Sequence, residues 1–325
     1  MNKLSLILIL LIAVSCSSIE NENNDTDYNG HVIATDISNQ QITSFAEDSL
    51  GHIWIGTPRG ANKYITYEYH QYFHGDDTFS LCDNQIRHIY RDSKNRMWFA
   101  TANGICVYNE KDCFEKIPID NPNQNAMQIL EDSEGRIFLN MVVNICEYKP
   151  EHNRFVIISS NFDIDKTYNN RCFTDDANNL WSVTSFHIRR FNTENFELKE
   201  MINTPSPVHY SFMRDNGELW LASGNNLFVF DTKTSTFIAT PEIIKNHPLL
   251  SKTVITYIHP YTSTTLLINT QTGLFLYDLA KKTVMFQSED GFPFEVPKFK
   301  ITTMFTDSQS NLWIGSTDQG YVVAP

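Results

Sequence analysis

Short segments in which apolar and polar residues alternate recur along this chain. Examples are "QITSFAED", "QIRHIYRD", "AMQILED" and "KITTMFTD", and a polar turn rich in Asp, Ser, Asn or Gly follows each of them. Period-two alternation between turn residues is typical of β-strands, and no long segment has a convincing period of 3.6 residues. The pattern therefore predicts an all-β protein.

A second strand with a large central side chain follows each turn. It reads "HIWIGT", "RMWFAT", "RIFLNM", "NLWSVT", "ELWLAS", "TLLINT" and "NLWIGS", with Trp54, Trp98, Phe138, Trp181, Trp220, Leu267 and Trp313 in equivalent slots. The intervals between these slots are 44, 40, 43, 39, 47 and 46 residues. Two further short strands complete each unit. Four strands repeated at this period predict a seven-bladed β-propeller with four-stranded antiparallel blades.

Two residues of the repeat invite a functional interpretation, but a structural one is favoured for both. The repeated Asp (Asp48, Asp92, Asp132, Asp175 and Asp307) could bind calcium, yet each turn offers one carboxylate where a calcium loop needs several oxygen ligands. Asp side chains commonly accept hydrogen bonds from nearby backbone N–H groups and so fix tight turns. The repeated Trp is expected to pack between neighbouring blades.

The last repeat has three strands before Pro325, whereas "HVIAT" (His31–Thr35) is a lone strand ahead of the first repeat. If that strand pairs with the last blade, the ring closes and no long sheet edge stays open. We therefore expect residues 31–325 to form the propeller, closed by an N-terminal strand that completes the last blade.

The N-terminal residues 1–16, "MNKLSLILILLIAVSC", have a basic start, an apolar run and small residues before Cys16. This predicts a secretory signal, and the ending "IAVSC" resembles a bacterial lipobox with Cys16 as the lipidated residue. An ordinary signal peptide or an uncleaved anchor is the alternative. Residues 17–30 are polar and acidic, as expected of a flexible tether. The chain is expected to be exported, as a periplasmic or outer-membrane-associated lipoprotein of a Gram-negative bacterium.

Composition excludes some functions. The net charge of -13 argues against nucleic acid as a partner, because phosphate binding needs a basic surface. Besides Cys16, five cysteines without a C-x-x-C spacing favour neither a disulfide framework nor a zinc site. His70 and His74 are expected in the outer strand and exit loop of blade one, spaced to share a strand face, where a metal site would need further ligands. No catalytic motif is present, so we predict no enzyme activity, no cofactor and no metal.

Propeller geometry indicates where a ligand would bind. The loops from the second to the third strand of each blade, and those from the fourth strand to the next blade, converge at one end of the ring. Amides mixed with aromatic rings suit a sugar, which needs hydrogen bonds and an apolar platform. The predicted ligand-binding residues are Arg59, Asn103, Tyr168, Phe186, His187, Tyr210, Asn225, Gln271 and Asp318, with His209 and Phe294 nearby in the same kind of loop. Solvated loop residues are the alternative.

The repeat "ITSFAEDSLGHIWIGT" resembles the two-component regulator propeller repeat, and the first two repeats together resemble the sensor region of hybrid two-component regulators from Bacteroides-type bacteria. The similarity covers about residues 38–325 and is weaker in repeats three and six, where Phe138 and Leu267 replace Trp. The fifth repeat, "RDNGELW", looks shorter in its turn. The resemblance implies a periplasmic propeller that detects oligosaccharides released from polysaccharides and signals to a histidine kinase, which this chain does not contain.

Three functions follow from these observations. The first is a periplasmic ligand-sensing module of a two-component system that binds an oligosaccharide and signals through a homodimer or a partner signalling protein. The second is a stand-alone lipid-anchored propeller, held to the membrane by its N-terminus, that acts as a scaffold for glycan or protein. The third is an enzyme of the propeller lyase or hydrolase kind, because fold alone does not exclude one.

Overall fold

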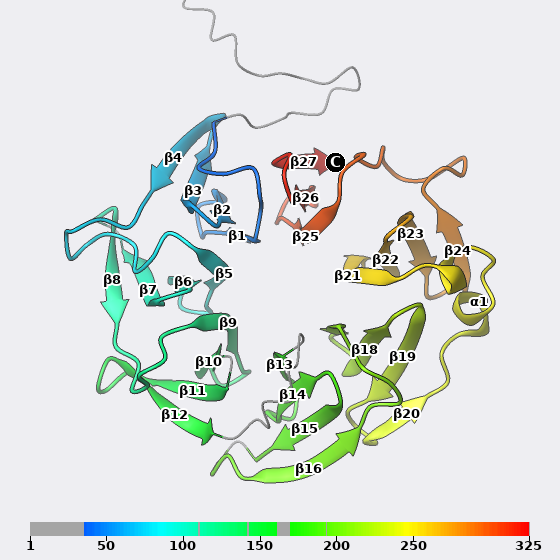
Figure 1. Ribbon diagram of the computed structural model, residues 1–325, viewed down its shortest axis with the longest axis horizontal. Coiled ribbons are helices and arrows are strands. Elements are labelled where there is room, and N and C mark those ends of the chain that lie inside the picture. The colour runs from blue at the N-terminus through cyan, green and yellow to red at the C-terminus, as the bar shows by residue number, and fades with distance from the viewer. Residues whose placement is uncertain (1–35, 110, 142, 161–169, 193, 325) are drawn as a thin grey trace, which may run out of the picture.

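A computed structural model describes residues 36–324 apart from 110, 142, 161–169 and 193, and it has seven antiparallel sheets arranged radially around one axis. Figure 1 looks along this axis, and the strands run in each sheet from the inside of the ring to the outside in chain order. We call them strands a, b, c and d. The predicted seven-bladed β-propeller with four-stranded antiparallel blades is confirmed.

The first four blades each have four strands. Their bounds are β1 (Ser44–Glu47), β2 (Ile53–Thr57), β3 (Gly60–Ile65) and β4 (Glu68–Tyr72) in blade 1; β5 (Ile86–Arg91), β6 (Met97–Thr101), β7 (Gly104–Asn109) and β8 (Cys113–Ile117) in blade 2; β9 (Ala126–Glu131), β10 (Ile137–Met141), β11 (Asn144–Lys149) and β12 (Arg154–Ser160) in blade 3; β13 (Asn170–Thr174), β14 (Leu180–Thr184), β15 (His187–Phe191) and β16 (Leu198–Asn203) in blade 4.

The remaining blades follow the same order, with two short helical turns between blades 5 and 6. Their bounds are β17 (Tyr210–Met213), β18 (Glu218–Ser223), β19 (Asn226–Asp231) and β20 (Thr236–Ile238) in blade 5, then α1 (Glu242–Lys245) and the 3₁₀ turn η1 (Leu250–Lys252); β21 (Ile255–Thr262), β22 (Thr265–Thr270), β23 (Gly273–Asp278) and β24 (Thr283–Phe286) in blade 6; β25 (Ile301–Thr306), β26 (Leu312–Ser316) and β27 (Tyr321–Ala324) in blade 7.

Blade 7 has three strands within the described part of the chain. The strand expected to complete it, His31–Thr35, lies outside the described residues, as do the predicted signal sequence 1–16 and the tether 17–30. Between residues 36 and 324, no described helix has the length and apolar character needed to cross a membrane.

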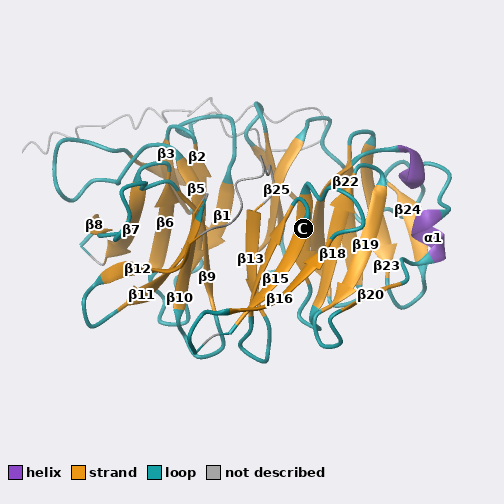
Figure 2. Cartoon of the chain, turned by 60° about the horizontal axis from the view of Figure 1, so that its bottom comes forward, coloured by secondary structure: helices purple, strands orange, loops and turns teal. Residues whose placement is uncertain are grey.

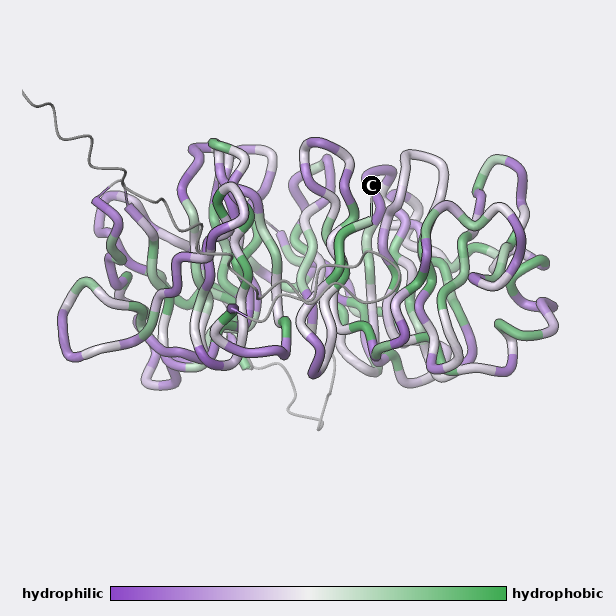
Figure 3. The backbone as a smooth tube through the Cα atoms, turned by 90° about the horizontal axis from the view of Figure 1, so that it is seen from above, coloured by the Kyte–Doolittle hydropathy of each residue, from purple (hydrophilic) through white to green (hydrophobic). Residues whose placement is uncertain are grey.

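The ring has two ends, and different connections form each of them (Figure 2). The turns from strand a to strand b and from c to d lie at one end, which we call the a–b end. The turns from b to c and the segments from d to the next a lie at the other, the b–c end. Hydrophobic residues concentrate in the strands between the two ends, and the loops are mainly hydrophilic (Figure 3).

The repeated Asp organises the a–b turn, as predicted. In blade 2, Asp92 Oδ1 accepts hydrogen bonds from the backbone N–H groups of Lys94 and Arg96 at 3.0 and 2.8 Å. Its Oδ2 accepts from Arg96 Nε at 2.6 Å and from the indole N–H of Trp98 at 2.8 Å. Asn95 occupies the left-handed region with φ 63°, which Asn tolerates better than most residues. Both oxygens of the carboxylate are therefore hydrogen-bonded to the turn or to the tryptophan of the next strand.

Blade 5 builds the same turn with the charges exchanged. Arg214 occupies the Asp position, since its N–H donates to the carbonyl of Glu218 at 3.0 Å, as Asp92 N–H does to Arg96. Its guanidinium donates to Glu218 Oε2 at 2.7 Å, and that oxygen also accepts the Trp220 indole N–H at 3.2 Å. The expectation of a shorter turn here is wrong. Arg214 and Glu218 span the same number of residues as Asp92 and Arg96.

The core of the ring consists of seven clusters of buried hydrophobic residues, and each cluster joins two neighbouring blades. Trp98 is fully buried and packs against Tyr148 and Phe155 of blade 3, with ring centroids 5.1 and 5.7 Å apart. Trp54 packs in the same way against Tyr108 of blade 2 at 4.6 Å. The predicted packing role of the repeated tryptophan is therefore confirmed.

The first and last blades also pack against each other, so the ring is continuous (Figure 1). The N–H of Ile42 donates to the carbonyl of Ser316 at 2.9 Å. Near the a–b end, the carboxylate of Glu47 accepts hydrogen bonds from the backbone N–H and the hydroxyl of Ser308 at 2.8 and 2.6 Å. Hydrogen bonds therefore join blades 1 and 7 at both ends of their inner strands.

Candidate ligand-binding cavity

A cavity of about 500 Å³ lies on the inner side of the ring, toward the a–b end. Residues of β5, β9, β13 and β17, the innermost strands of blades 2 to 5, line it together with the a–b turns of blades 4 and 5. Its wall combines the rings of His88, Tyr90 and Phe173 with amide, hydroxyl and carboxylate groups. This volume lies in the range of pockets that hold small ligands.

His88 forms the part of the wall between blades 2 and 3. Its Nδ1 accepts a hydrogen bond from the backbone N–H of Ile129 at 3.3 Å, so the proton of the neutral ring is on Nε2. Burial, reinforced by the charge of the nearby Arg171, lowers the pKa of His88 to about 4. His88 is therefore neutral at physiological pH and holds two blades together as a hydrogen-bond acceptor.

Gln128 forms the equivalent connection between blades 3 and 4. Its Nε2 donates to the carbonyl of Cys172 at 3.0 Å, and its Oε1 accepts from the N–H of Cys172 at 3.0 Å. Both hydrogen bonds reach the backbone of the next inner strand, so the side chain takes the place of a strand partner across the gap between blades. Two hydrogen bonds therefore fix this part of the wall to the next blade.

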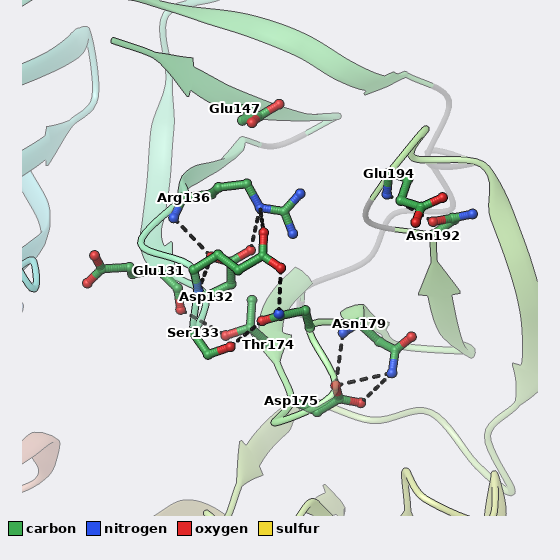
Figure 4. A network of polar contacts seen from close by, with 12 residues as sticks. Glu131, Asp132, Ser133, Arg136, Glu147, Thr174, Asp175, Asn179, Asn192 and Glu194 are labelled. Carbon is green, nitrogen blue, oxygen red and sulfur yellow. Dashed lines mark hydrogen bonds and ion pairs between the residues drawn. The ribbon is translucent and has the colours of Figure 1, made fainter.

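Glu131 is the centre of a polar network that lies nearer the a–b end than these two contacts. Its carboxylate accepts hydrogen bonds from the N–H and the hydroxyl of Ser93 in blade 2 at 2.8 and 2.5 Å and from Tyr90 at 3.5 Å. Its carbonyl accepts from the hydroxyl of Thr174 in blade 4 at 2.9 Å (Figure 4). Burial, reinforced by the charge of Glu131, raises the pKa of Tyr90, so the phenol stays protonated and can donate.

The rim of the cavity carries two carboxylates that the fold does not use. Asp176 and Asp215 are exposed, and neither has a hydrogen-bond or ion-pair partner among the described residues. Their neighbour Asp175, in contrast, accepts from the Trp181 indole at 2.7 Å and from Asn179. The other five blades carry a hydroxyl residue at the position of Asp176 and Asp215, namely Ser49, Ser93, Ser133, Thr262 and Ser308.

These groups suit a polar ligand with several hydroxyl groups. Carboxylates at the rim accept hydrogen bonds, the Arg214 guanidinium and the Tyr90 phenol donate them, and the Phe173 ring provides an apolar surface. The carboxylate of Glu218 is already paired with Arg214. Burial acts to raise its pKa, but hydrogen bonds from Arg214 and Trp220 lower the pKa overall and keep it ionised.

The predicted ligand-binding residues that the structure describes lie at the other end of the ring, and none of these lines the cavity. Six are exposed in b–c turns, and His187 is half-buried at the start of β15. Tyr168 lies outside the described residues. The exposed six are Arg59, Asn103, Phe186, Asn225, Gln271 and Asp318.

Tyr210 differs from its expected place in a loop, because it is the first residue of β17 and is buried. Its hydroxyl donates to the carbonyl of Ile258 in blade 6 at 3.1 Å, and the Arg171 guanidinium lies 4.7 Å from its ring centre. Its neighbour His209 contacts the Ile255 carbonyl, and Phe294 packs against Tyr261. Tyr210 therefore joins two blades and is not available as a platform for a sugar ring.

Metal ligation finds no support in the part of the chain that the structure describes. No group of three or more His, Cys, Asp or Glu side chains is arranged to hold a metal ion there. His70 lies on β4 and His74 lies beyond its end, as expected of an outer strand and its exit loop, and His74 Nδ1 contacts the carbonyl of Leu81 at 2.7 Å.

Residues 36–59 and 80–103 match the protein-family model described as Two component regulator propeller. Blades 1 and 2 therefore carry two component regulator propeller repeats. The resemblance noted in the sequence is confirmed for these two blades. No curated protein sequence matches the chain.

Solved structures similar to the chain include extracellular domains from B. thetaiotaomicron. Two structures of the extracellular domain of BT4673, one described as a one component system and the other as a hybrid two component system, are 18% and 19% identical over 88% of this chain, with TM-scores of 0.71 and 0.68. That of the hybrid two component system BT3049 is 20% identical over 89% with a TM-score of 0.70. The chain spans 40% of the length of each, and the likeness shows the fold.

Propellers that are enzymes have the same fold. A streptogramin B lyase structure is 13% identical over 89% of this chain and 95% of its own, with a TM-score of 0.66. The architecture is therefore compatible with catalysis as well as with binding, and the function must be inferred from the side chains.

Proposed function

We propose that the chain is the ligand-sensing propeller of a two-component type regulatory system that acts outside the cytoplasm. It binds an oligosaccharide fragment in the cavity lined by the inner strands of blades 2 to 5. The observation that carries this proposal is the match of blades 1 and 2 to the two component regulator repeat, in a ring that also holds a polar cavity of about 500 Å³.

The chemistry of the cavity supports a sugar ligand. Sugar sites combine hydrogen-bonding groups that fix hydroxyls with an apolar surface for a ring face. Phe173 supplies such a surface, and Asp176 and Asp215 supply acceptors that the fold leaves unused. Binding would connect blades 3, 4 and 5, and the signal would pass by a shift between two arrangements of a homodimer or of a complex with a partner signalling protein.

Isothermal titration of the purified chain with a panel of oligosaccharides tests the proposal. The double variant Asp176→Asn/Asp215→Asn is expected to weaken binding about tenfold or more, because charge-assisted hydrogen bonds are lost. The matched control, Asn103→Ala/Gln271→Ala, changes two exposed residues at the b–c end and should bind as the wild type does.

The reverse pattern would place the ligand at the b–c end and overturn the cavity as the site. If no oligosaccharide of the panel gives a heat of binding, the proposal of a sugar ligand is overturned. Turnover of a panel member would favour an enzyme of the lyase or hydrolase kind. Binding with no effect on any partner or on dimerisation would favour the stand-alone scaffold.

The predicted N-terminal lipid anchor is tested separately. Metabolic labelling with a fatty-acid probe is expected to label the wild-type chain in the membrane fraction and to leave Cys16→Ala unlabelled. Labelling that persists in Cys16→Ala would contradict lipidation at this residue.

A further inference from the structure

A lead-in segment that includes Ser38 precedes β1 and packs onto β3, which is strand c of blade 1. In blade 1, Ser38 of this lead-in segment meets Asn62 on β3. The N–H of Ser38 donates to Asn62 Oδ1 at 2.7 Å, and Asn62 Nδ2 donates to the Ser38 hydroxyl at 2.9 Å. Two side chains thus fasten the lead-in segment of blade 1 to its blade.

Blade 2 has cysteines at both of these positions. Ser38 is six residues before Ser44, and Cys82 is six residues before the equivalent His88. Asn62 is eight residues after Trp54, and Cys106 is eight residues after Trp98. The repeat therefore predicts that Cys82 and Cys106 face each other as Ser38 and Asn62 do.

The contacts of blade 2 agree with this equivalence. Cys82 and Cys106 belong to one buried cluster, and they are 8% and 0% exposed. A Cβ atom placed on Gly104, which precedes Cys106 by two residues on β7, would lie 3.3 Å from Cys82 Cβ and 3.5 Å from its sulfur. Burial, together with the neighbouring Cys82 thiol, raises the pKa of Cys106.

Two buried thiols fasten a segment poorly, because S–H is a weak donor and sulfur a weak acceptor. A covalent bond between them would do what the Ser38–Asn62 hydrogen bonds do in blade 1. We propose that Cys82 and Cys106 form a disulfide when the chain folds in an oxidising compartment, and that this bond locks the lead-in segment of blade 2 onto β7.

The chemistry balances as a thiol–disulfide exchange. The thiolate of one cysteine attacks a small disulfide oxidant such as oxidised glutathione and forms a mixed disulfide, releasing one glutathione thiol. The second thiolate displaces the other glutathione, so the two cysteines lose two electrons and two protons and the oxidant becomes two thiols. Because both sulfurs are buried in the folded chain, the exchange takes place during folding.

The test uses the full chain with Cys16→Ser, which leaves five cysteines. The reduced chain is unfolded and refolded in a glutathione redox buffer, free thiols are counted in denaturant, and unreduced peptides are mapped by mass spectrometry. We expect three free thiols, one peptide pair joining Cys82 to Cys106, and a midpoint of thermal unfolding several degrees higher than that of the reduced chain.

Matched variants separate the disulfide from a general effect of cysteine loss. Cys82→Ala and Cys106→Ala should abolish the difference in melting temperature between oxidised and reduced samples. Cys146→Ala, at the equivalent buried position of blade 3, should preserve it. Five free thiols after oxidation, or links through Cys113, Cys146 or Cys172 in place of this pair, would overturn the proposal.

Discussion

Blades 2 and 5 solve the same packing problem with opposite charges. In blade 2, a buried acid at the start of the a–b turn holds the basic Arg96 and the indole of Trp98. In blade 5, the base comes first as Arg214, and Glu218 holds the indole of Trp220. The comparison teaches that the turn needs a carboxylate oxygen to accept the indole N–H, and that this carboxylate can stand at the first position of the turn or at the fifth.

The two blades also differ on the inner strand. His88 of blade 2 and Tyr210 of blade 5 occupy equivalent positions, opposite Ala100 and Ala222 of strand b. Each forms a hydrogen bond to the inner strand of the next blade, as an acceptor in blade 2 and as a donor in blade 5. Only the connection made by His88 contains a group that titrates between pH 4 and 7.

The largest effect is expected from the tryptophan that both arrangements hold. Trp98→Ala removes a fully buried ring from the contact between blades 2 and 3 and should lower the free energy of unfolding by about 3–5 kcal/mol. Trp220→Ala should have a similar cost in blade 5. Urea denaturation measures both, and a cost below about 1 kcal/mol for either would contradict the shared role.

Reversing one charge in blade 5 should cost less than removing the tryptophan. Arg214→Asp sets a second carboxylate against Glu218 in a partly buried site and should destabilise the protein by about 2–3 kcal/mol. Adding Glu218→Arg recreates the order of charges found in blade 2, so the double variant should return to within about 1 kcal/mol of the wild type. A double-mutant cycle from urea denaturation measures the coupling, and additive costs would refute the equivalence of the two arrangements.

The contact made by His88 in blade 2 should depend on pH, whereas the contact made by Tyr210 in blade 5 should not. The pKa of His88 is about 4 in the folded state and about 6.5 in an unfolded chain. Between these values the unfolded state binds the proton more readily, so stability should fall as the pH drops from about 6.5 to about 4, by on the order of 1 kcal/mol for this half-buried ring.

Denaturation curves measured between about pH 6.5 and about pH 4 test whether His88, and not Tyr210, causes this loss of stability. His88→Gln should flatten the pH dependence, whereas Tyr210→Phe should leave its slope unchanged. His259 in blade 6 has a pKa lowered to about 4 by burial as well, so part of the slope should persist until His259→Gln is added.

The smallest effects are expected at the left-handed residue of the turn. Asn95→Gly in blade 2 should change stability by less than about 0.5 kcal/mol, because both residues tolerate positive φ. Gly217→Asn in blade 5 should cost about 1 kcal/mol, since a Cβ there would lie 2.8 Å from Thr232 Oγ1. Thermal unfolding of both variants measures the difference, and equal costs would contradict the steric explanation.

The fold could be predicted from the sequence because every blade repeats a local pattern that carries its own structural reason. The Trp and Leu slots all fall on strand b, and the Asp turns precede them as expected. In blade 5 Arg214 stands at the Asp position, and the neighbouring Asp215 is not equivalent to the repeated Asp. Only the hydrogen bonds of the turn reveal that exchange.

The cavity could not be predicted in the same way. Its wall combines single residues from four inner strands and two turns, and strand alternation does not say which of them turn toward a common space. Tyr210 illustrates the difficulty, because an aromatic residue after a polar loop gave no sign that it was buried between blades. One signal was present: Asp176 and Asp215 stand where five other repeats have a hydroxyl residue.

The contacts that join blades 7 and 1 have a consequence for the order of the blades. Blades 1 and 7 share a cluster of buried hydrophobic residues, and hydrogen bonds from Ile42 to Ser316 and from Ser308 to Glu47 add to it. Contacts between segments that lie far apart in the sequence therefore fasten the circle at this position. A circularly permuted chain, opened within a b–c turn such as that at Asn225, should assemble the same circle of sheets.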